Sequence, residues 1–118
     1  MEQRLRPHER IRRRTDFQRV YERGVRAGGR FGTLFLLPNE QTHGRFGIAA
    51  TKKLGGAVQR NRAKRLLREV FRRNKIAPGF DVVVVARRDL LDASLTALEA
   101  EYRKLLDRAR RALSHSRV

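Results

Sequence analysis

Residues 82–86 are apolar at every position, four valines followed by an alanine. A strand with one face in water alternates apolar and polar residues, whereas a strand that is covered on both faces shows no such alternation. The run is far too short to cross a membrane as a helix. It therefore predicts a central strand of a sheet, and the rest of the chain has to supply neighbouring strands and a cover for both faces.

Two helices are expected before this strand. The first should begin at Thr15, where Thr15 and Gln18 have the spacing of a capping box. Phe17, Val20 and Tyr21 then fall on one face at helical spacing. A longer helix is expected over residues 57–74.

A last helix is expected after the strand, starting near Thr96, where Thr96 and Glu99 form another possible capping box. An apolar stripe at helical spacing predicts the face that this helix buries. The stripe consists of Leu95, Leu98, Tyr102, Leu105, Leu106, Ala109 and Leu113.

Two more strands are expected, over residues 31–37 and 45–51, joined by a polar turn and paired as an antiparallel hairpin. Residues 25–30, rich in glycine and arginine, are expected to be a link. The order is helix, strand, strand, helix, strand, helix. This order indicates an α+β fold, a two-layer sandwich of a mixed sheet with helices mainly on one face.

A chain of 118 residues makes one domain. Residues 15–113 are expected to form it, with a basic N-terminal arm at 1–14, a break at Pro78-Gly79 and a frayed tail at 114–118. The arginines of the arm have two interpretations: a solvated tail, or an extension that becomes ordered on RNA.

The formal net charge of +17 points to a polyanionic partner, and nucleic acid is the first candidate. The chain has no cysteine, which excludes disulfides and zinc–thiolate sites. The first thirty residues contain many arginines and no long apolar stretch, so no signal peptide is expected. With no membrane span expected either, the protein should be cytoplasmic.

The helix over residues 57–74 separates its charges from its apolar residues. Over residues 61–74 the apolar residues fall opposite an arc of about 100° that holds only cations and one asparagine. Glu69 is the only acid and is expected to lie off this arc. A solvated helix face would mix acids with its cations, so the arc predicts contact with nucleic acid. We call this arc, together with Arg60 beside it, the basic ridge: Arg60, Asn61, Lys64, Arg65, Arg68 and Arg72.

Residues 52–65 read KKLGGAVQRNRAKR. This segment resembles the RNR signature of bacterial ribonuclease P protein subunits, which runs roughly K-K-x-G-x-A-V-x-R-N-R-x-K-R. Residues 16–24, 45–48 and 81–88 also look like the first helix, a strand and the late apolar strand of that family. The resemblance covers roughly residues 4–112.

The resemblance implies a fold like domain 2 of ribosomal protein S5, with a left-handed βαβ crossover through the signature helix. It also implies a protein cofactor of a ribonucleoprotein endoribonuclease, which removes the 5′ leader from precursor tRNA. The signature helix and the loop before it would bind the catalytic RNA. The residues implied for this contact are Lys52, Lys53, Arg60, Asn61, Arg62, Lys64, Arg65, Arg68 and Arg72.

The resemblance places the single-stranded leader in a cleft between the first helix and the sheet. Aromatic faces suit such a site because unpaired bases stack on them with little sequence preference. Ordinary core packing is the alternative interpretation of the three aromatic residues. The residues implied for leader binding are Arg13, Phe17, Tyr21, Arg30 and Phe35.

No catalytic or metal site is expected on the protein itself. His8, His43 and His115 lie far apart in the sequence, and the acids form no compact cluster. The resemblance implies that Mg²⁺ held mainly by the RNA subunit carries out hydrolysis, with no small-molecule cofactor. Two alternatives remain open: a structural, ribosomal-type RNA-binding protein, and a protein-only nuclease, which the scattered acids disfavour.

Overall fold

The structure, a computed structural model, describes residues 5–75 and 79–116. The start of the expected arm, Pro78 and the last two residues of the expected tail lie outside the described residues. No helix in the described ranges is long and apolar enough to cross a membrane. The helices and strands are α1 (Arg14–Arg23), β1 (Val25–Gly28), β2 (Gly32–Pro38), β3 (Arg45–Ala49), α2 (Ala57–Arg73), β4 (Phe80–Ala86) and α3 (Leu95–Ser116).

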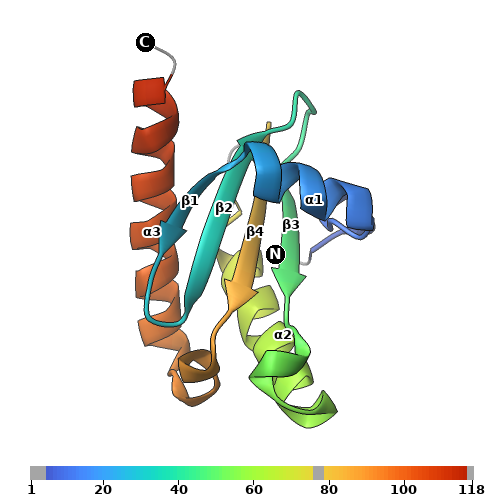
Figure 1. The fold of residues 1–118 in the computed structure, drawn as a ribbon, viewed down its shortest axis with the longest axis vertical. Coiled ribbons are helices and arrows are strands. Elements are labelled where there is room, and N and C mark those ends of the chain that lie inside the picture. Colours follow the sequence, from blue (N-terminus) through green and yellow to red (C-terminus); the bar gives the residue numbers. More distant parts are fainter. Residues whose placement is uncertain (1–4, 76–78, 117–118) are drawn as a thin grey trace.

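The strands form one sheet in the order β1-β2-β4-β3 (Figure 1). The all-apolar segment is β4, and it lies between β2 and β3 as a central strand, which confirms the prediction. The expected hairpin of β2 with β3 is wrong, because β4 pairs antiparallel with β2 and parallel with β3. The expected link at 25–30 is also wrong: most of it is β1, which pairs antiparallel with β2.

The connection from β3 through α2 to β4 joins two parallel neighbouring strands. In Figure 1 both strands run downwards, β4 lies to the left of β3, and α2 passes behind the sheet. This geometry makes the crossover left-handed, as the family resemblance implied. General rules of chain topology favour the opposite hand.

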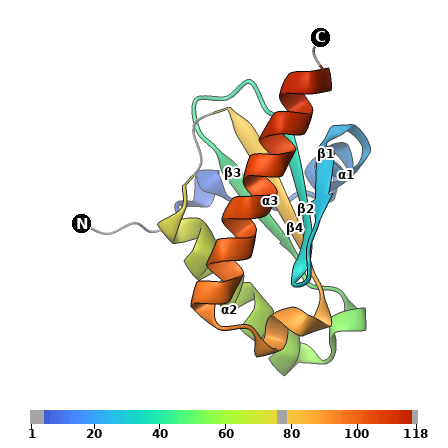
Figure 2. The same cartoon turned by 90° about the vertical axis from the view of Figure 1, so that its left-hand side faces the viewer.

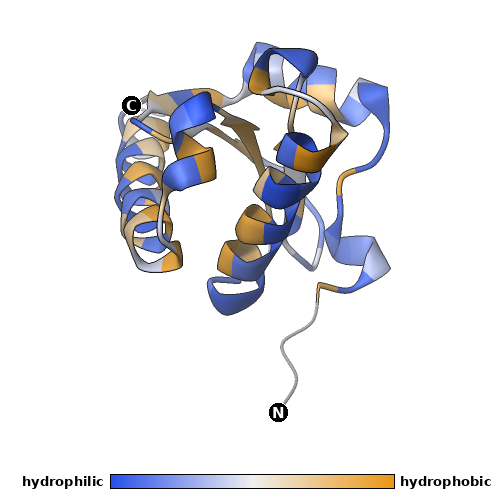
Figure 3. Cartoon of the chain, turned by 90° about the horizontal axis from the view of Figure 1, so that it is seen from below, coloured by the Kyte–Doolittle hydropathy of each residue, from blue (hydrophilic) through white to orange (hydrophobic). Residues whose placement is uncertain are grey.

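Helices α2 and α3 cover one face of the sheet, and α1 lies on the other (Figure 2). The residues of β4 alternate between the two layers: Val82 and Val84 pack with α2 and α3, and Val83 packs with α1. Phe46 of β3 stacks on Phe71 of α2, with ring centroids 4.7 Å apart. Hydrophobic residues recur along the helices among hydrophilic ones, as amphipathic packing requires (Figure 3).

Both expected capping boxes are wrong. Helix α1 begins at Arg14, and its N-cap, Arg13, makes no side-chain capping hydrogen bond. Helix α3 begins at Leu95, where the backbone N–H of Ala97 donates to Ser94 Oγ. Glu99 was the expected partner of Thr96 in the second box. Its carboxylate instead accepts a hydrogen bond from the Asn74 amide at the end of α2. Helix α3 also continues to Ser116, beyond the boundary expected at 113.

Residues 5–13 of the expected arm lie against the domain. The backbone N–H of Ile11 donates to the carbonyl of Phe46 at 2.8 Å, so the segment runs along the free edge of β3. The Ile11 side chain is 5% exposed and belongs to the core layer under α1. Covering an edge strand in this way protects its unpaired backbone groups.

Candidate nucleic-acid interface

The orientation of the basic ridge is set by the opposite face of α2. Ala63, Leu67, Val70 and Phe71 are buried against the sheet and α3. Because these residues hold one side of the helix in the core, the ridge faces outwards. Within it, Asn61, Arg65 and Arg68 are exposed, and Arg60, Lys64 and Arg72 are partly buried.

Two residues of the predicted RNA-binding set make contacts within the protein. Arg72 forms an ion pair with Glu69, the acid expected to lie off the arc, so one cation of the ridge has an acidic partner within the helix. Hydrogen bonding to Glu69 raises the pKa of Arg72. Arg62 donates from Nε to the carbonyl of Leu91 at 2.9 Å, which directs its side chain towards the turn before α3.

The remaining members of that set are Lys52 and Lys53. Both lie exposed in the 3₁₀ turn Lys52–Leu54, immediately before α2. The buried Leu54 fastens this turn to the core. The two lysines therefore extend the positive surface from the ridge to the start of α2.

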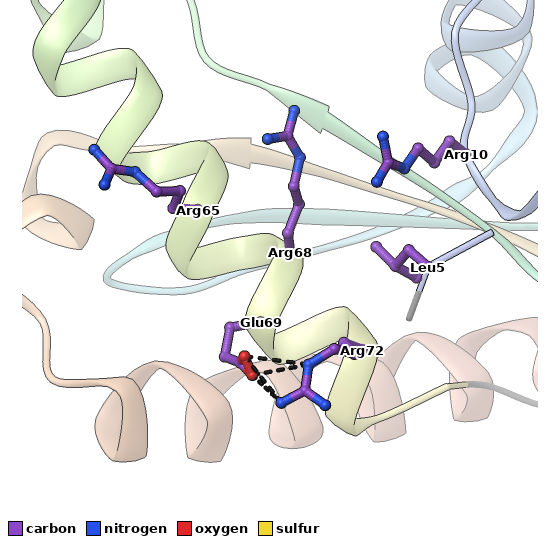
Figure 4. Close-up of a pocket in the computed structure, with 6 residues that line it drawn as sticks. All are labelled: Leu5, Arg10, Arg65, Arg68, Glu69 and Arg72. Carbon is purple, nitrogen blue, oxygen red and sulfur yellow. Dashed lines mark hydrogen bonds and ion pairs between the residues drawn. The ribbon is translucent and has the colours of Figure 1, made fainter. Parts of the chain in front are cut away.

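A hollow of about 260 Å³ beside the ridge brings in a cation that sequence reasoning missed. Figure 4 shows Arg65 and Arg68 extending from α2, while Arg10 reaches in from the N-terminal segment. No local pattern marks Arg10, because its position depends on the pairing of its segment with β3.

The three predicted aromatic residues come together between α1 and β2. The Tyr21 and Phe35 rings meet edge to face with centroids 5.0 Å apart, and the Phe17 and Tyr21 centroids are 6.3 Å apart. Tyr21 is 38% exposed, and Phe17 and Phe35 are partly buried. Burial raises the pKa of Tyr21, so its hydroxyl stays neutral. We call these three residues the aromatic cluster.

Phe17 has a second role within this cluster. It packs with Ile11 and Val83, and a Cβ on Gly47 would lie 2.9 Å from its ring. Phe17 therefore occupies space that only a glycine in β3 leaves free. Of the three aromatic residues, Tyr21 is the most available to a ligand.

The two predicted leader-binding arginines lie apart from one another. Arg13 is exposed at the start of α1. Arg30 lies in the β1–β2 turn, where its backbone N–H donates to Glu101 of α3 at 2.7 Å and its Nε lies 3.3 Å from Asp89. These contacts hold Arg30 beside α3, the layer opposite the aromatic cluster.

Two other arginines lie on the face of the sheet that carries the cluster. Arg26 of β1 is directly opposite Phe35, so both side chains point to the same face. Arg87 donates from Nη2 to Thr33 Oγ1 at 3.3 Å, two residues from Phe35. Finding Arg26 from the sequence would have required recognising β1 as a strand.

A buried charge network anchors α1 to the sheet. Arg45 donates to both carboxylate oxygens of Asp81, at 2.9 and 2.7 Å, and contacts Asp16 of α1 at 3.4 Å. Asn39 donates to the same Asp81 carboxylate at 2.8 Å. Hydrogen bonding to Asp81 raises the pKa of Arg45 although burial opposes it, so the guanidinium remains charged.

The histidines and acids of the chain are the residue types that could hold a metal ion. The structure brings His8 and His43, distant in sequence, to a ring separation of 4.7 Å. Within residues 5–75 and 79–116, no three His, Cys, Asp or Glu side chains form a group that could hold a metal ion.

Replacing Arg65 and Arg68 together with alanine should weaken binding to RNA and make that binding less dependent on salt. If each contacts a phosphate, the slope of log K against log salt should become shallower by about 0.7–0.9 per lost contact. Titrations with the RNA subunit that the family resemblance implies, over a range of salt concentrations, measure this slope. The matched control replaces Lys104 and Arg108, two exposed cations of α3, and should leave the slope nearly unchanged. Equal slopes for the two double variants would contradict RNA contact by the ridge.

Comparison with known proteins identifies the family. The Ribonuclease P family model matches residues 5–110. The ribonuclease P protein component of Pelotomaculum thermopropionicum is 40% identical over 101 residues, which cover 84% of this chain and 90% of the relative. That of Clostridioides difficile is 34% identical over 101 residues, covering 83% and 89%.

Solved structures agree with this result. A mutant RNase P protein of Staphylococcus aureus superposes with a TM-score of 0.78 at 33% identity, covering 87% of this chain and 89% of the other. The RNase P protein of Thermotoga maritima gives a TM-score of 0.73 at 32% identity, covering 87% and 96%. This chain therefore belongs to the ribonuclease P protein family, the RNA-binding protein components of a tRNA-processing ribonucleoprotein.

Proposed function

We propose that this chain binds the catalytic RNA of ribonuclease P and, as its protein cofactor, helps to remove the 5′ leader of precursor tRNA by endonucleolytic cleavage. Family membership supports the assignment to the ribonucleoprotein. The observation that carries the proposal is the presence of two different surfaces, the basic ridge on α2 and the aromatic cluster between α1 and β2. A structural RNA-binding protein would need the ridge alone.

The ridge is the proposed contact with the RNA subunit. Its exposed arginines, Arg65 and Arg68, have no ion pair with an acid of the described residues. Cations placed close together without counterions repel each other, and a phosphate backbone would offset that repulsion. Lys52 and Lys53 would extend the contact along the loop before α2.

The aromatic cluster is the proposed contact with the 5′ leader. A single-stranded leader exposes unpaired bases, which stack on aromatic rings, and its phosphates need nearby cations. Tyr21 offers the exposed ring, and Arg26 and Arg87 lie on the same face of the sheet. This site would distinguish precursor tRNA, which has a leader, from the mature product, which has none.

The proposed division of labour leaves the hydrolytic chemistry to the RNA subunit, which would hold most of the Mg²⁺. The residues of this chain would hold the RNA and orient the leader. No residue is proposed as a general acid, a general base or a nucleophile.

A reconstitution with three arms tests the proposal. Precursor tRNA is incubated with the protein alone, with the RNA subunit alone, and with both, at low magnesium concentration. We expect no cleavage by the protein alone and much faster cleavage by the complex than by the RNA alone, because the protein adds binding contacts to the substrate. Cleavage at the tRNA 5′ end by the protein alone would instead indicate a protein-only nuclease. Equal rates with and without protein would contradict the cofactor role.

A further inference from the structure

Val58, in the first turn of α2, is 76% exposed. Among the described residues Tyr21 is the only other exposed large hydrophobic residue; it is 38% exposed and belongs to the aromatic cluster. Valine is a poor choice for an exposed helix position, because its branched side chain loses rotamer freedom there and gains no burial. Folding therefore does not explain this residue.

Val58 forms one wall of a shallow hollow of about 320 Å³ on the outer side of α2. Leu66, two turns along the helix, contributes a second apolar wall and is itself partly buried against the core. Arg62 and Arg65 complete the lining. The hollow thus has an apolar surface between two planar cations and no acidic group in its lining.

The two arginines differ in how they are held. The hydrogen bond from Arg62 Nε to the carbonyl of Leu91 ties its guanidinium to the turn before α3. Arg65 is exposed, and no acid in the described part of the chain pairs with it. A guanidinium fixed through one edge keeps its flat face available for stacking, and a free guanidinium remains available for a phosphate.

We propose that this hollow binds one unpaired base of the ribonuclease P RNA subunit, with the base against Val58 and Leu66 and beside the Arg62 guanidinium. The inference rests on the proposed function and adds base recognition to the phosphate contacts of the ridge. RNA-binding proteins take up unstacked bases on apolar, aromatic and guanidinium surfaces of this kind. The surrounding cations favour RNA over an apolar segment of another protein, which would bring no charge to offset them.

The test uses Val58→Ser in the full-length chain with the ribonuclease P RNA subunit. The substitution removes apolar surface and no charge. We expect the affinity for the RNA to fall about fivefold, the low end of the range for one lost base contact. The slope of log K against log salt should stay unchanged, because no phosphate contact is lost. The melting temperature should also stay unchanged, because Val58 is exposed.

Two further variants sharpen the measurement. Val58→Ile keeps a branched apolar side chain and should bind like the wild type. Gln59→Ser changes an exposed neighbour in the same helical turn that does not line the hollow, and it should also bind like the wild type. Base probing with dimethyl sulfate and a carbodiimide should show an unpaired nucleotide that wild-type protein protects and Val58→Ser leaves reactive.

Several results would overturn the inference. Unchanged affinity and protection in Val58→Ser would remove the base site while leaving the ridge in place. A lower melting temperature would assign Val58 to folding. A wild-type dimer that Val58→Ser dissociates, with RNA affinity unchanged, would show that a second copy covers this surface. Wild-type protein that fails to bind the RNA subunit would overturn the proposed function as well.

Discussion

Arg45→Ala should lower the free energy of unfolding by about 3–5 kcal/mol, because it leaves a buried carboxylate without its ion pair. Asp81 is 1% exposed, and Arg45 supplies two of its hydrogen bonds. Asn39 would remain as a neutral donor, which does not compensate a buried negative charge. The contact between Arg45 and Asp16 of α1 would be lost in the same variant.

Urea denaturation at neutral pH measures this effect, and the chain provides a matched control. Arg30 and Asp89 form a pair of similar chemistry whose side chains are 74% and 61% exposed. Arg30→Ala should therefore cost no more than about 1 kcal/mol. Similar costs for the two variants would show that the Arg45 network does not stabilise the fold in the way its burial implies.

The Arg45–Asp81 pair also allows a test of why Arg45→Ala destabilises the fold. Replacing Arg45 with methionine and Asp81 with leucine removes both charges of the pair. No unpaired carboxylate then remains buried, as it does in Arg45→Ala. Buried ion pairs exchanged for apolar side chains of similar volume are often neutral or stabilising. The double variant should therefore recover a large part of the stability that Arg45→Ala loses, and a further loss would indicate that the network is needed for its geometry.

Tyr21→Ala should weaken the binding of precursor tRNA to the reconstituted complex by roughly 5- to 150-fold, the range for losing one stacked base. Mature tRNA, which has no leader, should bind as before. Tyr21 suits this experiment because its ring is the most exposed of the aromatic cluster. The ratio of the two affinities is the quantity to measure, together with the thermal melt of the variant.

Tyr21→Phe and Phe17→Ala are the companion variants. Tyr21→Phe retains the ring and should keep the preference for precursor tRNA. Phe17→Ala removes a side chain that packs over Gly47 and Ile11, so it should lower the melting temperature as well. If Tyr21→Ala left the affinity ratio intact, Tyr21 would have no part in leader binding.

The elements that sequence reasoning located correctly are those whose signal lies within a few residues. The apolar run of β4 required cover on both faces wherever the strand was placed. The separation of cations from apolar residues in α2 required a basic outer face wherever the helix packed. Both conclusions follow from the periodicity of a single element, which long-range contacts do not alter.

Elements whose structure depends on a distant partner were missed or misassigned. Strand β1 has only four residues, and its pairing with β2 makes it a strand. The Thr96 and Glu99 spacing is that of a capping box, yet Glu99 contacts Asn74, which the sequence separates from it by 25 positions. The hairpin of β2 with β3 was the simplest local pairing, but β4 entered between them because it needed a neighbour on each side.

The site divides in the same way. Local sequence pattern placed the cations of α2 on one helix face and Phe17 and Tyr21 on one face of α1. The family resemblance, and not the pattern, implied a role of these aromatic residues in leader binding. Packing between distant segments added Arg10 beside the ridge and Arg26 opposite Phe35, and it held Arg30 against α3. A helix face is defined by the order of residues within one short segment. Which other segments lie next to that face depends on how the whole core packs, and no short stretch of the chain determines that packing.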